Sequence, residues 1–183
     1  MKDRKGIRNR SSSLGIYMVW MKSDPDKAGY KMIDIKISTK NNIDELMSIR
    51  LEMLKVVNNL PEDYEYSDEM INESRDYFLN GDHLTVIAVD KDVVIGCASM
   101  SFIRIMPTFE HPTGKRAHLM NVYTRSGYRR QGIARRMVEL LIEKTWEKGA
   151  TEISLDATTL GRPLYEKMGF NDSAECMVLT KGK

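Results

Sequence analysis

Residues 122–136, VYTRSGYRRQGIARR, combine the residue types that bind an anion, since the segment holds five arginines and two glycines. Its first residues are typical of a strand, and apolar positions recur at helical spacing from Ile133 onward. A helix N-terminus leaves about four backbone N–H groups without partners and carries roughly half a positive charge. Gly132 lets the backbone approach a phosphate closely, and Ala134 is too small to obstruct it. The pattern predicts an anion site where a strand turns into a helix.

Other interpretations of this segment stay open or fail on particular residues. The arginines could form an ordinary solvated helix face, with Gly132 serving only as a turn. A P-loop is excluded because no lysine followed by a hydroxyl residue comes after the glycine. A dinucleotide fingerprint needs more glycines than Gly127 and Gly132. A nucleic-acid surface would need stacking aromatics beyond Tyr123 and Tyr128.

The surrounding sequence predicts the elements that position this segment. Hydrophobic periods and turn residues predict a strand at 33–37, a helix from Asn42 to Asn58 with Asn42 and Glu45 as a capping box, and a helix at 68–79. A hairpin of strands 84–89 and 93–105 and a strand at 117–124 follow, and then a long helix that ends at Gly149. The last predicted elements are a strand at 153–157, a short helix with Pro163 in its first turn that ends at Gly169, and one or two strands within 170–180. This order predicts an α/β (α+β) fold, with one sheet and helices packed on its faces.

Residues 129–134, Arg-Arg-Gln-Gly-Ile-Ala, resemble the core motif of the GNAT N-acetyltransferase superfamily, which is Arg or Gln, two residues, Gly, one residue, then Gly or Ala. The preceding NVYT and the later GRPLYEKMGF at 161–170 stand in the family's order. Ser126 departs from the proline of many members. The resemblance implies a GNAT-like mixed, mostly antiparallel central sheet, with helices on both faces and a splay between its two central parallel strands. It extends over a predicted domain at residues 32–183.

The resemblance also implies the donor half of a reaction, with acetyl-CoA as cosubstrate. The implied coenzyme-binding residues are Val122, Tyr123 and Thr124 along the pantetheine, Arg129, Arg130, Gln131, Gly132, Ile133, Ala134 and Arg135 around the pyrophosphate, and Tyr165. The N–H of Val122 is the implied oxyanion donor, Tyr165 the implied acid for the leaving thiolate, and Asn121 a residue that orients substrate. The implied activity is direct transfer to a primary amine of a small molecule or peptide in a ternary complex. A non-catalytic acyl-CoA-binding regulatory module on the same fold is the alternative.

The acceptor half is less defined, because several residues could deprotonate the amine. The candidate bases are Glu52, Glu110, His111, His118 and Asp156. We expect the first two helices and residues 102–115 to set substrate specificity. An acidic group could attract a cationic amine or be an ordinary solvated loop; its members are Glu62, Asp63, Glu65, Asp68 and Glu69.

Composition limits the remaining possibilities. The chain has 183 residues, and 28 Lys and Arg against 26 Asp and Glu give a net charge of +2, which favours neither nucleic acid nor membrane as a partner. Cys97 and Cys176 are too few for a disulfide framework, which favours the cytoplasm, and Cys97 in a hydrophobic run is a structural thiol rather than an acyl acceptor. The histidines lack metal-ligand spacing, so no metal is expected. Residues 1–31 are predicted to be a flexible or adventitious extension, and a homodimer is possible.

Overall fold

The computed structural model describes residues 33–173 and 177–181 and contains one five-stranded sheet. Its strands, in the spatial order β1-β2-β3-β4-β5, are β1 Asp34–Ile37, β2 His83–Asp90, β3 Val93–Arg104, β4 Lys115–Thr124 and β5 Glu152–Leu155. The first three pairings are antiparallel and β4–β5 is parallel. The predicted fold class, a mixed and mostly antiparallel sheet with helices, is confirmed. The predicted extension at residues 1–31 lies outside the described residues.

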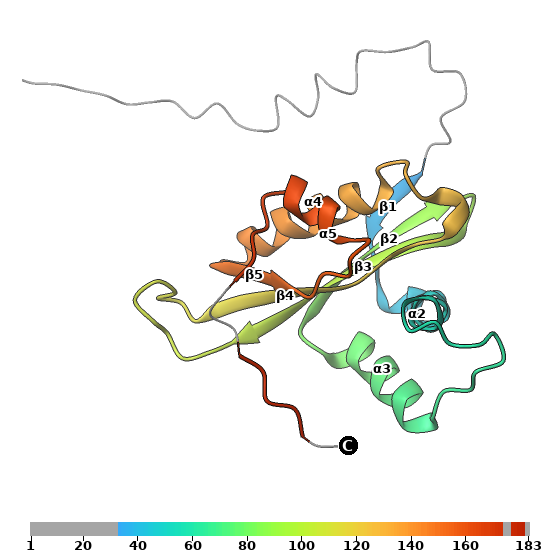
Figure 1. Cartoon of the computed structure of the whole chain (residues 1–183), viewed down its shortest axis with the longest axis horizontal. Coiled ribbons are helices and arrows are strands. Elements are labelled where there is room, and N and C mark those ends of the chain that lie inside the picture. Colours follow the sequence, from blue (N-terminus) through green and yellow to red (C-terminus); the bar gives the residue numbers. More distant parts are fainter. Residues whose placement is uncertain (1–32, 174–176, 182–183) are drawn as a thin grey trace, which may run out of the picture. The chain divides into compact units, whose positions relative to one another are not determined.

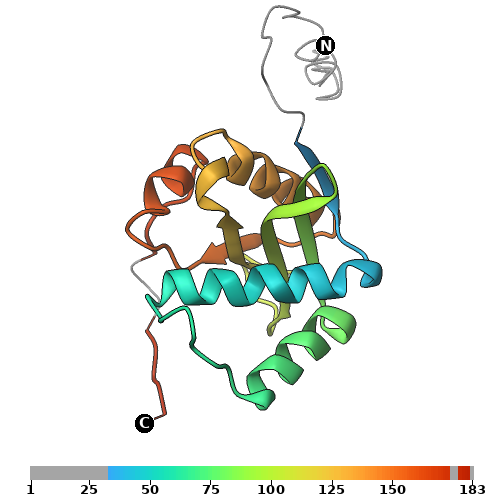
Figure 2. The same ribbon diagram turned by 90° about the vertical axis from the view of Figure 1, so that its right-hand side faces the viewer.

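Helices cover both faces of this sheet (Figures 1 and 2). The helical elements are η1 Lys40–Asn42, α2 Ile43–Val57, α3 Asp68–Asn80, η2 Ser126–Tyr128, α4 Ile133–Glu147 and α5 Arg162–Lys167. The helices α2 and α3 lie on one face, and α4 and α5 lie on the other. None of the helices in the described part of the chain is both long enough and apolar enough to cross a membrane.

Two separate apolar cores hold these layers together, because β2 and β3 bury side chains on both faces. On one face, Met137 and Leu141 of α4 are fully buried against strand residues such as Met100. On the other face, Ile49 of α2 packs in a second cluster that includes Cys97. The sheet is therefore anchored from both sides, and α4 keeps a fixed orientation at the end of β4.

Most predicted elements are confirmed, but the start of the first long helix differs in detail. Asn42 precedes α2 without making a side-chain cap to it. Its Oδ1 instead accepts a hydrogen bond from the backbone N–H of Thr39 at 3.0 Å, which stabilises the short η1 turn. The capping box that the sequence predicted between Asn42 and Glu45 was wrong, because a 3-10 turn occupies the residues immediately before the helix.

The C-terminal segment also differs from the prediction. No strand forms in the described part of residues 170–180, where Met177, Val178 and Leu179 are at least 83% exposed. A strand needs a hydrogen-bonding neighbour, which apolar composition alone does not supply. Without a strand beyond β5 in the described sheet, the parallel pair β4–β5 stands at the edge of the sheet rather than at its centre.

The buried side chains of α4 should contribute to the free energy of unfolding of the domain. Leu141→Ala removes a fully buried side chain and should lower the free energy of unfolding by about 2–5 kcal/mol. Leu160→Ala makes the same change at a residue that is 92% exposed and should cost less than about 0.5 kcal/mol. Urea denaturation of both variants measures the difference. Equal destabilisation by the two substitutions would contradict the assigned core.

Candidate functional site

An extra residue in β4 changes which face its side chains occupy. Cys97 of β3 pairs with Tyr123, and Ser99 pairs with Met120. Residues 121 and 122 of β4 therefore both oppose residue 98 of β3. Asn121 adopts a φ of 56°, a left-handed conformation that asparagine tolerates better than most residues. As a result of this bulge, Val122 packs on the core under α4, whereas Tyr123 packs on the core under α2.

Beyond the bulge, β4 presents an open edge. Its parallel pairing with β5 stops at Leu119 and Leu155, and residues 120–124 have no strand beside them on that side within the described sheet. The N–H of Arg125 donates to Ile95 of β3 at 2.9 Å. Because backbone groups alternate sides along a strand, the N–H groups of residues 122 and 124 point away from β3, toward the open edge. The backbone of Tyr123 points toward β3, so of the three predicted strand contacts only Val122 and Thr124 offer backbone groups there.

The turn after β4 presents a run of backbone donors. Arg130 and Gly132 have φ values of 63° and 76°, and the first hydrogen bond of the helix start runs from the N–H of Arg136 to the carbonyl of Gly132 at 3.0 Å. Within the described residues, the N–H groups of 130–135 have no hydrogen-bond acceptor. A Cβ built on Gly132 would meet no atom within 4 Å. These donors and this space fit a phosphate or pyrophosphate.

The arginine side chains around this turn bond to carbonyl and carboxylate groups of the protein itself. Arg129 donates from Nε to the carbonyl of Thr124 at 2.9 Å, and Arg135 forms an ion pair with Glu139 at 2.8 Å. Arg136 donates to the carbonyl of Ile33 at 3.2 Å. Ile133 is buried in the core and Ala134 is half-buried, whereas Gln131 is exposed. An anion here would therefore be bound chiefly by backbone donors.

Tyr165, in α5, packs against the same core as Val122. Its ring meets Phe170 edge to face, with centroids 5.9 Å apart. Its hydroxyl has no hydrogen-bond partner among residues 33–173 and 177–181, and burial raises the pKa of the phenol above its usual value. The hydroxyl therefore stays protonated at physiological pH and is available as a donor.

Glu52 of α2, a candidate base, is held in an ion pair. Its carboxylate accepts from Arg125 at 2.8 Å and from the hydroxyl of Tyr123 at 3.0 Å. The hydrogen bond to Glu52 raises the pKa of Arg125, and burial, followed by the same carboxylate, raises the pKa of Tyr123. These partners keep the carboxylate occupied, so its role in this structure is to position the end of β4.

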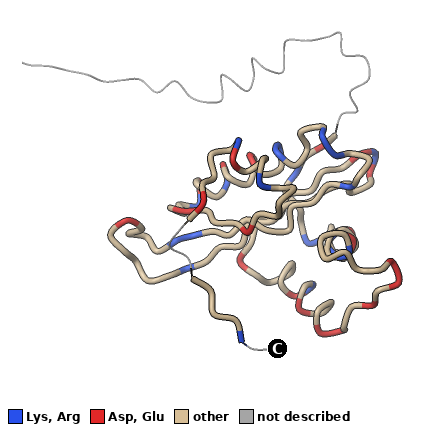
Figure 3. Tube along the Cα trace, in the orientation of Figure 1, with Lys and Arg blue, Asp and Glu red and all other residues tan. Residues whose placement is uncertain are grey.

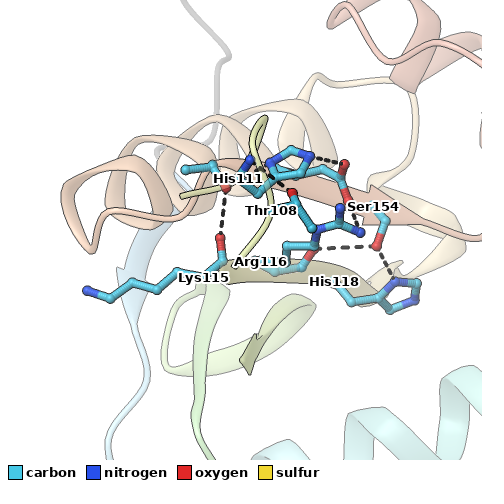
Figure 4. A network of polar contacts seen from close by, with 9 residues as sticks. Thr108, His111, Lys115, Arg116, His118 and Ser154 are labelled. Carbon is cyan, nitrogen blue, oxygen red and sulfur yellow. Dashed lines mark hydrogen bonds and ion pairs between the residues drawn. The ribbon is translucent and has the colours of Figure 1, made fainter. Parts of the chain in front are cut away.

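Of the other candidate bases, His111 and His118 lie in a network between β4 and β5 (Figure 4), whereas Asp156 directly follows β5, level with Met120 in the parallel register. His111 contacts Thr151 at 3.0 Å through Nδ1 and Glu152 at 3.3 Å through Nε2. His118 contacts Ser154 at 2.9 Å, and Asp156 lies 3.7 Å away from its ring. At about 3.3 Å per residue, position 118 is roughly 13 Å along the strand from position 122. The network links β4 to β5, and Glu110 is exposed in the preceding loop.

One polar residue at the site carried no recognisable signal in the sequence. Arg50 of α2 donates from Nη1 to Oδ1 of Asn121 at 3.1 Å and from Nε to Oγ of Ser74 at 3.2 Å. The amide of Asn121 in turn reaches Ser99 and Cys97 at 3.4 and 3.5 Å. Asn121, predicted to orient substrate, is therefore buried in a network. Arg50 lies 71 residues before Asn121 in the chain, a separation that no local pattern indicates.

Comparison with known proteins agrees with this geometry. Residues 46–170 match the model of the acetyltransferase (GNAT) family. The chain belongs to this family. A curated relative, glucosamine 6-phosphate N-acetyltransferase of Arabidopsis thaliana, is 24% identical over 107 residues, which cover 58% of this chain and 70% of the relative. The suspected membership is thereby confirmed.

Solved structures of acetyltransferases share the fold. A predicted acetyltransferase of Clostridium acetobutylicum, crystallised with acetyl-CoA, is 29% identical to this GNAT chain, with a TM-score of 0.72 over 81% of this chain and 96% of its own. An aminoglycoside N-acetyltransferase in complex with CoA has a TM-score of 0.65 at 18% identity, over 81% of this chain and 94% of its own. In the described part of the chain, no group of three His, Cys, Asp or Glu side chains is placed to hold a metal ion.

The buried thiol of Cys97 should be unreactive in the folded protein. Burial raises its pKa to about 12, so the thiolate fraction at pH 8 is about 10⁻⁴. In Cys176→Ser, which leaves one thiol, a disulfide reagent should label the native protein at least about 10³-fold more slowly than the urea-unfolded protein. Rapid labelling of the folded variant would show an accessible thiolate and restore a covalent route through Cys97.

Proposed function

We propose that this chain transfers an acetyl group from acetyl-CoA to a primary amine of a small molecule or peptide, by direct attack in a ternary complex. The observation that carries the proposal is the run of amides at 130–135 that have no acceptor among the described residues, in the turn that follows a strand edge with no neighbour in the described sheet. The Clostridium structure, described with acetyl-CoA, and the aminoglycoside enzyme, described with CoA, support a coenzyme A thioester as the donor.

In this proposal, the donor lies along β4 with its pyrophosphate at the turn. The backbone N–H groups of 130–135 bind the phosphate oxygens, and Gly132 gives them room. The pantetheine pairs with the backbone of Val122 and Thr124, which alternation turns toward the open edge. This arrangement places the thioester beside the bulge at Asn121, near the end of β4, where the strand packs on both cores of the protein.

The chemistry then follows from two donors on this chain. The amine nitrogen forms a bond to the carbonyl carbon of the thioester, and the N–H of Val122 stabilises the charge that develops on its oxygen. The carbon–sulfur bond breaks, and the hydroxyl of Tyr165 gives its proton to the departing sulfur. Glu52 is occupied by Arg125, and the rings of His111 and His118 are engaged by residues of the β5 segment. We therefore assign the amine proton to water.

The relatives support a small acceptor. The curated relative is named for acetylation of glucosamine 6-phosphate, and a solved relative is an aminoglycoside acetyltransferase. On this chain, α2 and α3 face the side of the bulge opposite α4, and we place the acceptor there. The acidic residues 62–69 are exposed around the segment that joins these two helices (Figure 3). We assign them to a solvated surface rather than to the site.

Donor binding predicts a contrast between two glycines. Acetyl-CoA should raise the melting temperature of the wild-type protein. Gly132→Ala forces a residue with a side chain into a left-handed backbone conformation, at a cost of roughly 1–2 kcal/mol, and places a methyl group beside the backbone N–H donors of the turn. Its acetyl-CoA affinity, measured by calorimetry, should fall about tenfold or more, equivalent to roughly 1.4 kcal/mol. Gly127→Ala also adds its methyl to open space, but without a left-handed φ, and should bind normally. Equal affinity in both variants would contradict the proposed binding of the pyrophosphate by the backbone N–H groups of 130–135.

Thiolate protonation predicts a selective loss of rate. Tyr165→Phe should lower kcat by about 10²-fold or more and leave the Kd of acetyl-CoA unchanged, because only the hydroxyl is lost. Burial raises the pKa of Tyr165, so the wild-type rate should decline on the basic side only above about pH 10, and the variant should lack that limb. A non-catalytic coenzyme-binding module would instead bind acetyl-CoA without turning over any amine, and this substitution would then change nothing measurable.

A further inference from the structure

Arg50 places a positive charge beside the bulge of β4. It leaves the middle of α2, and its guanidinium is half-buried between that helix, α3 and the sheet. Its two hydrogen bonds, to Asn121 at 3.1 Å and to Ser74 at 3.2 Å, go to neutral acceptors on two other elements. Both acceptors are themselves buried, so the guanidinium has a defined position.

The protein leaves this charge without a counter-ion. In residues 33–173 and 177–181, no carboxylate lies within ion-pair distance of Arg50. The ionisable groups that face it from the sheet and from the α2–α3 segment are the thiol of Cys97 and the phenol of Tyr66, and both are neutral at pH 7. Burial lowers the pKa of Arg50, which reflects the cost of keeping the charge out of water.

A nearby arginine shows the opposite arrangement. Arg125 approaches the same helix and is neutralised by Glu52 at 2.8 Å, with a second contact from Nε at 2.9 Å. Within the described residues, a carboxylate therefore neutralises one arginine of this face and none neutralises the other. An unpaired half-buried guanidinium is costly unless a ligand completes its environment.

The geometry of the guanidinium indicates what that ligand is. An arginine has five N–H donors, and the protein uses two of those on Arg50. The remaining donors form a planar fork that suits a carboxylate or a phosphate. The group that Arg50 holds, Asn121, directly precedes Val122, whose N–H is the proposed oxyanion donor. An anion on Arg50 would therefore lie beside the reacting amine.

We propose that the acceptor is an amine that carries an anionic group, a carboxylate or a phosphate, and that Arg50 binds this group. The inference rests on the proposed acetyl transfer and names its substrate class. An amino acid and an amino-sugar phosphate share this chemistry. The exposed acidic residues before α3 are a separate feature, because each of them is solvated rather than directed at the guanidinium.

The test uses pairs of amines that differ in the anion. Glucosamine 6-phosphate is compared with glucosamine, and serine with serinamide, at saturating acetyl-CoA. The wild-type kcat/KM should favour the anionic member of at least one pair by about tenfold or more, and the responding pair identifies phosphate or carboxylate as the anion. Arg50→Gln keeps a donor but removes the charge, so this preference should fall to near unity, because kcat/KM falls much further for the anionic amine than for its neutral counterpart. Arg50→Lys should recover part of it.

Two controls keep the outcome clear. Arg75→Gln removes an arginine from the same side of the sheet that is paired with Asp44 at 2.8 Å, and it should retain the preference. In the wild-type protein, inorganic phosphate or acetate should compete with the acceptor at saturating acetyl-CoA, a result that needs no variant to fold.

The failures of the two proposals are distinguishable. If acetyl-CoA does not stabilise the wild-type protein, the proposed function fails. If acetyl-CoA binds but neutral amines react as fast as anionic ones, or no anionic amine reacts, the substrate class is overturned and donor binding stands. Equal loss on both members of a pair in Arg50→Gln would overturn it as well, because it would show that Arg50 only positions Asn121.

Discussion

The geometry of the site depends on one constraint, the extra residue that β4 accommodates at its bulge. Without it, strict alternation would place Asn121 on the same face as Leu119, and Val122 on the opposite face. The left-handed φ of Asn121 allows two consecutive residues to oppose one residue of β3. The strand then serves both cores and presents an amide of Val122 at its free edge. The end of β4 in turn sets the position of the turn that follows it.

The same end of the strand is stabilised by contacts from other elements rather than by a neighbouring strand. Pairing with β5 ends at Leu119, so residues 120–124 depend on β3, on α2 and on the helix after the turn. Glu52 and Arg125 form one of these contacts, and the carbonyl of Thr124 accepts another from Arg129. These contacts hold the end of the strand, while the N–H groups of residues 122 and 124 still point toward the open edge.

Charge is distributed unequally across the face under α2. An ion pair neutralises Arg125, whereas the side chains that hold Arg50 in the described part of the chain are neutral. Both arrangements cost desolvation, but the attraction within an ion pair offsets part of this cost and a lone charge has no such compensation, so Arg50 marks the place where a ligand contributes most. The helices that build this face come from the part of the sequence with the weakest motif signal, while the donor side follows the family pattern. In the proposed reaction, acceptor specificity thus depends on contacts between distant segments.

Local patterns in the sequence determined most of the elements and the donor turn. The period of Met137 and Leu141 predicts α4, and Gly132 predicts a turn before it that allows close approach of the backbone, because both effects act within a few residues. Tertiary structure alone decided the bulge at Asn121, the approach of Arg50 across 71 residues, and the separation of His111 from the bulge. Each of these depends on register and packing between distant segments. Such contacts have no local period and so leave no signature in the sequence.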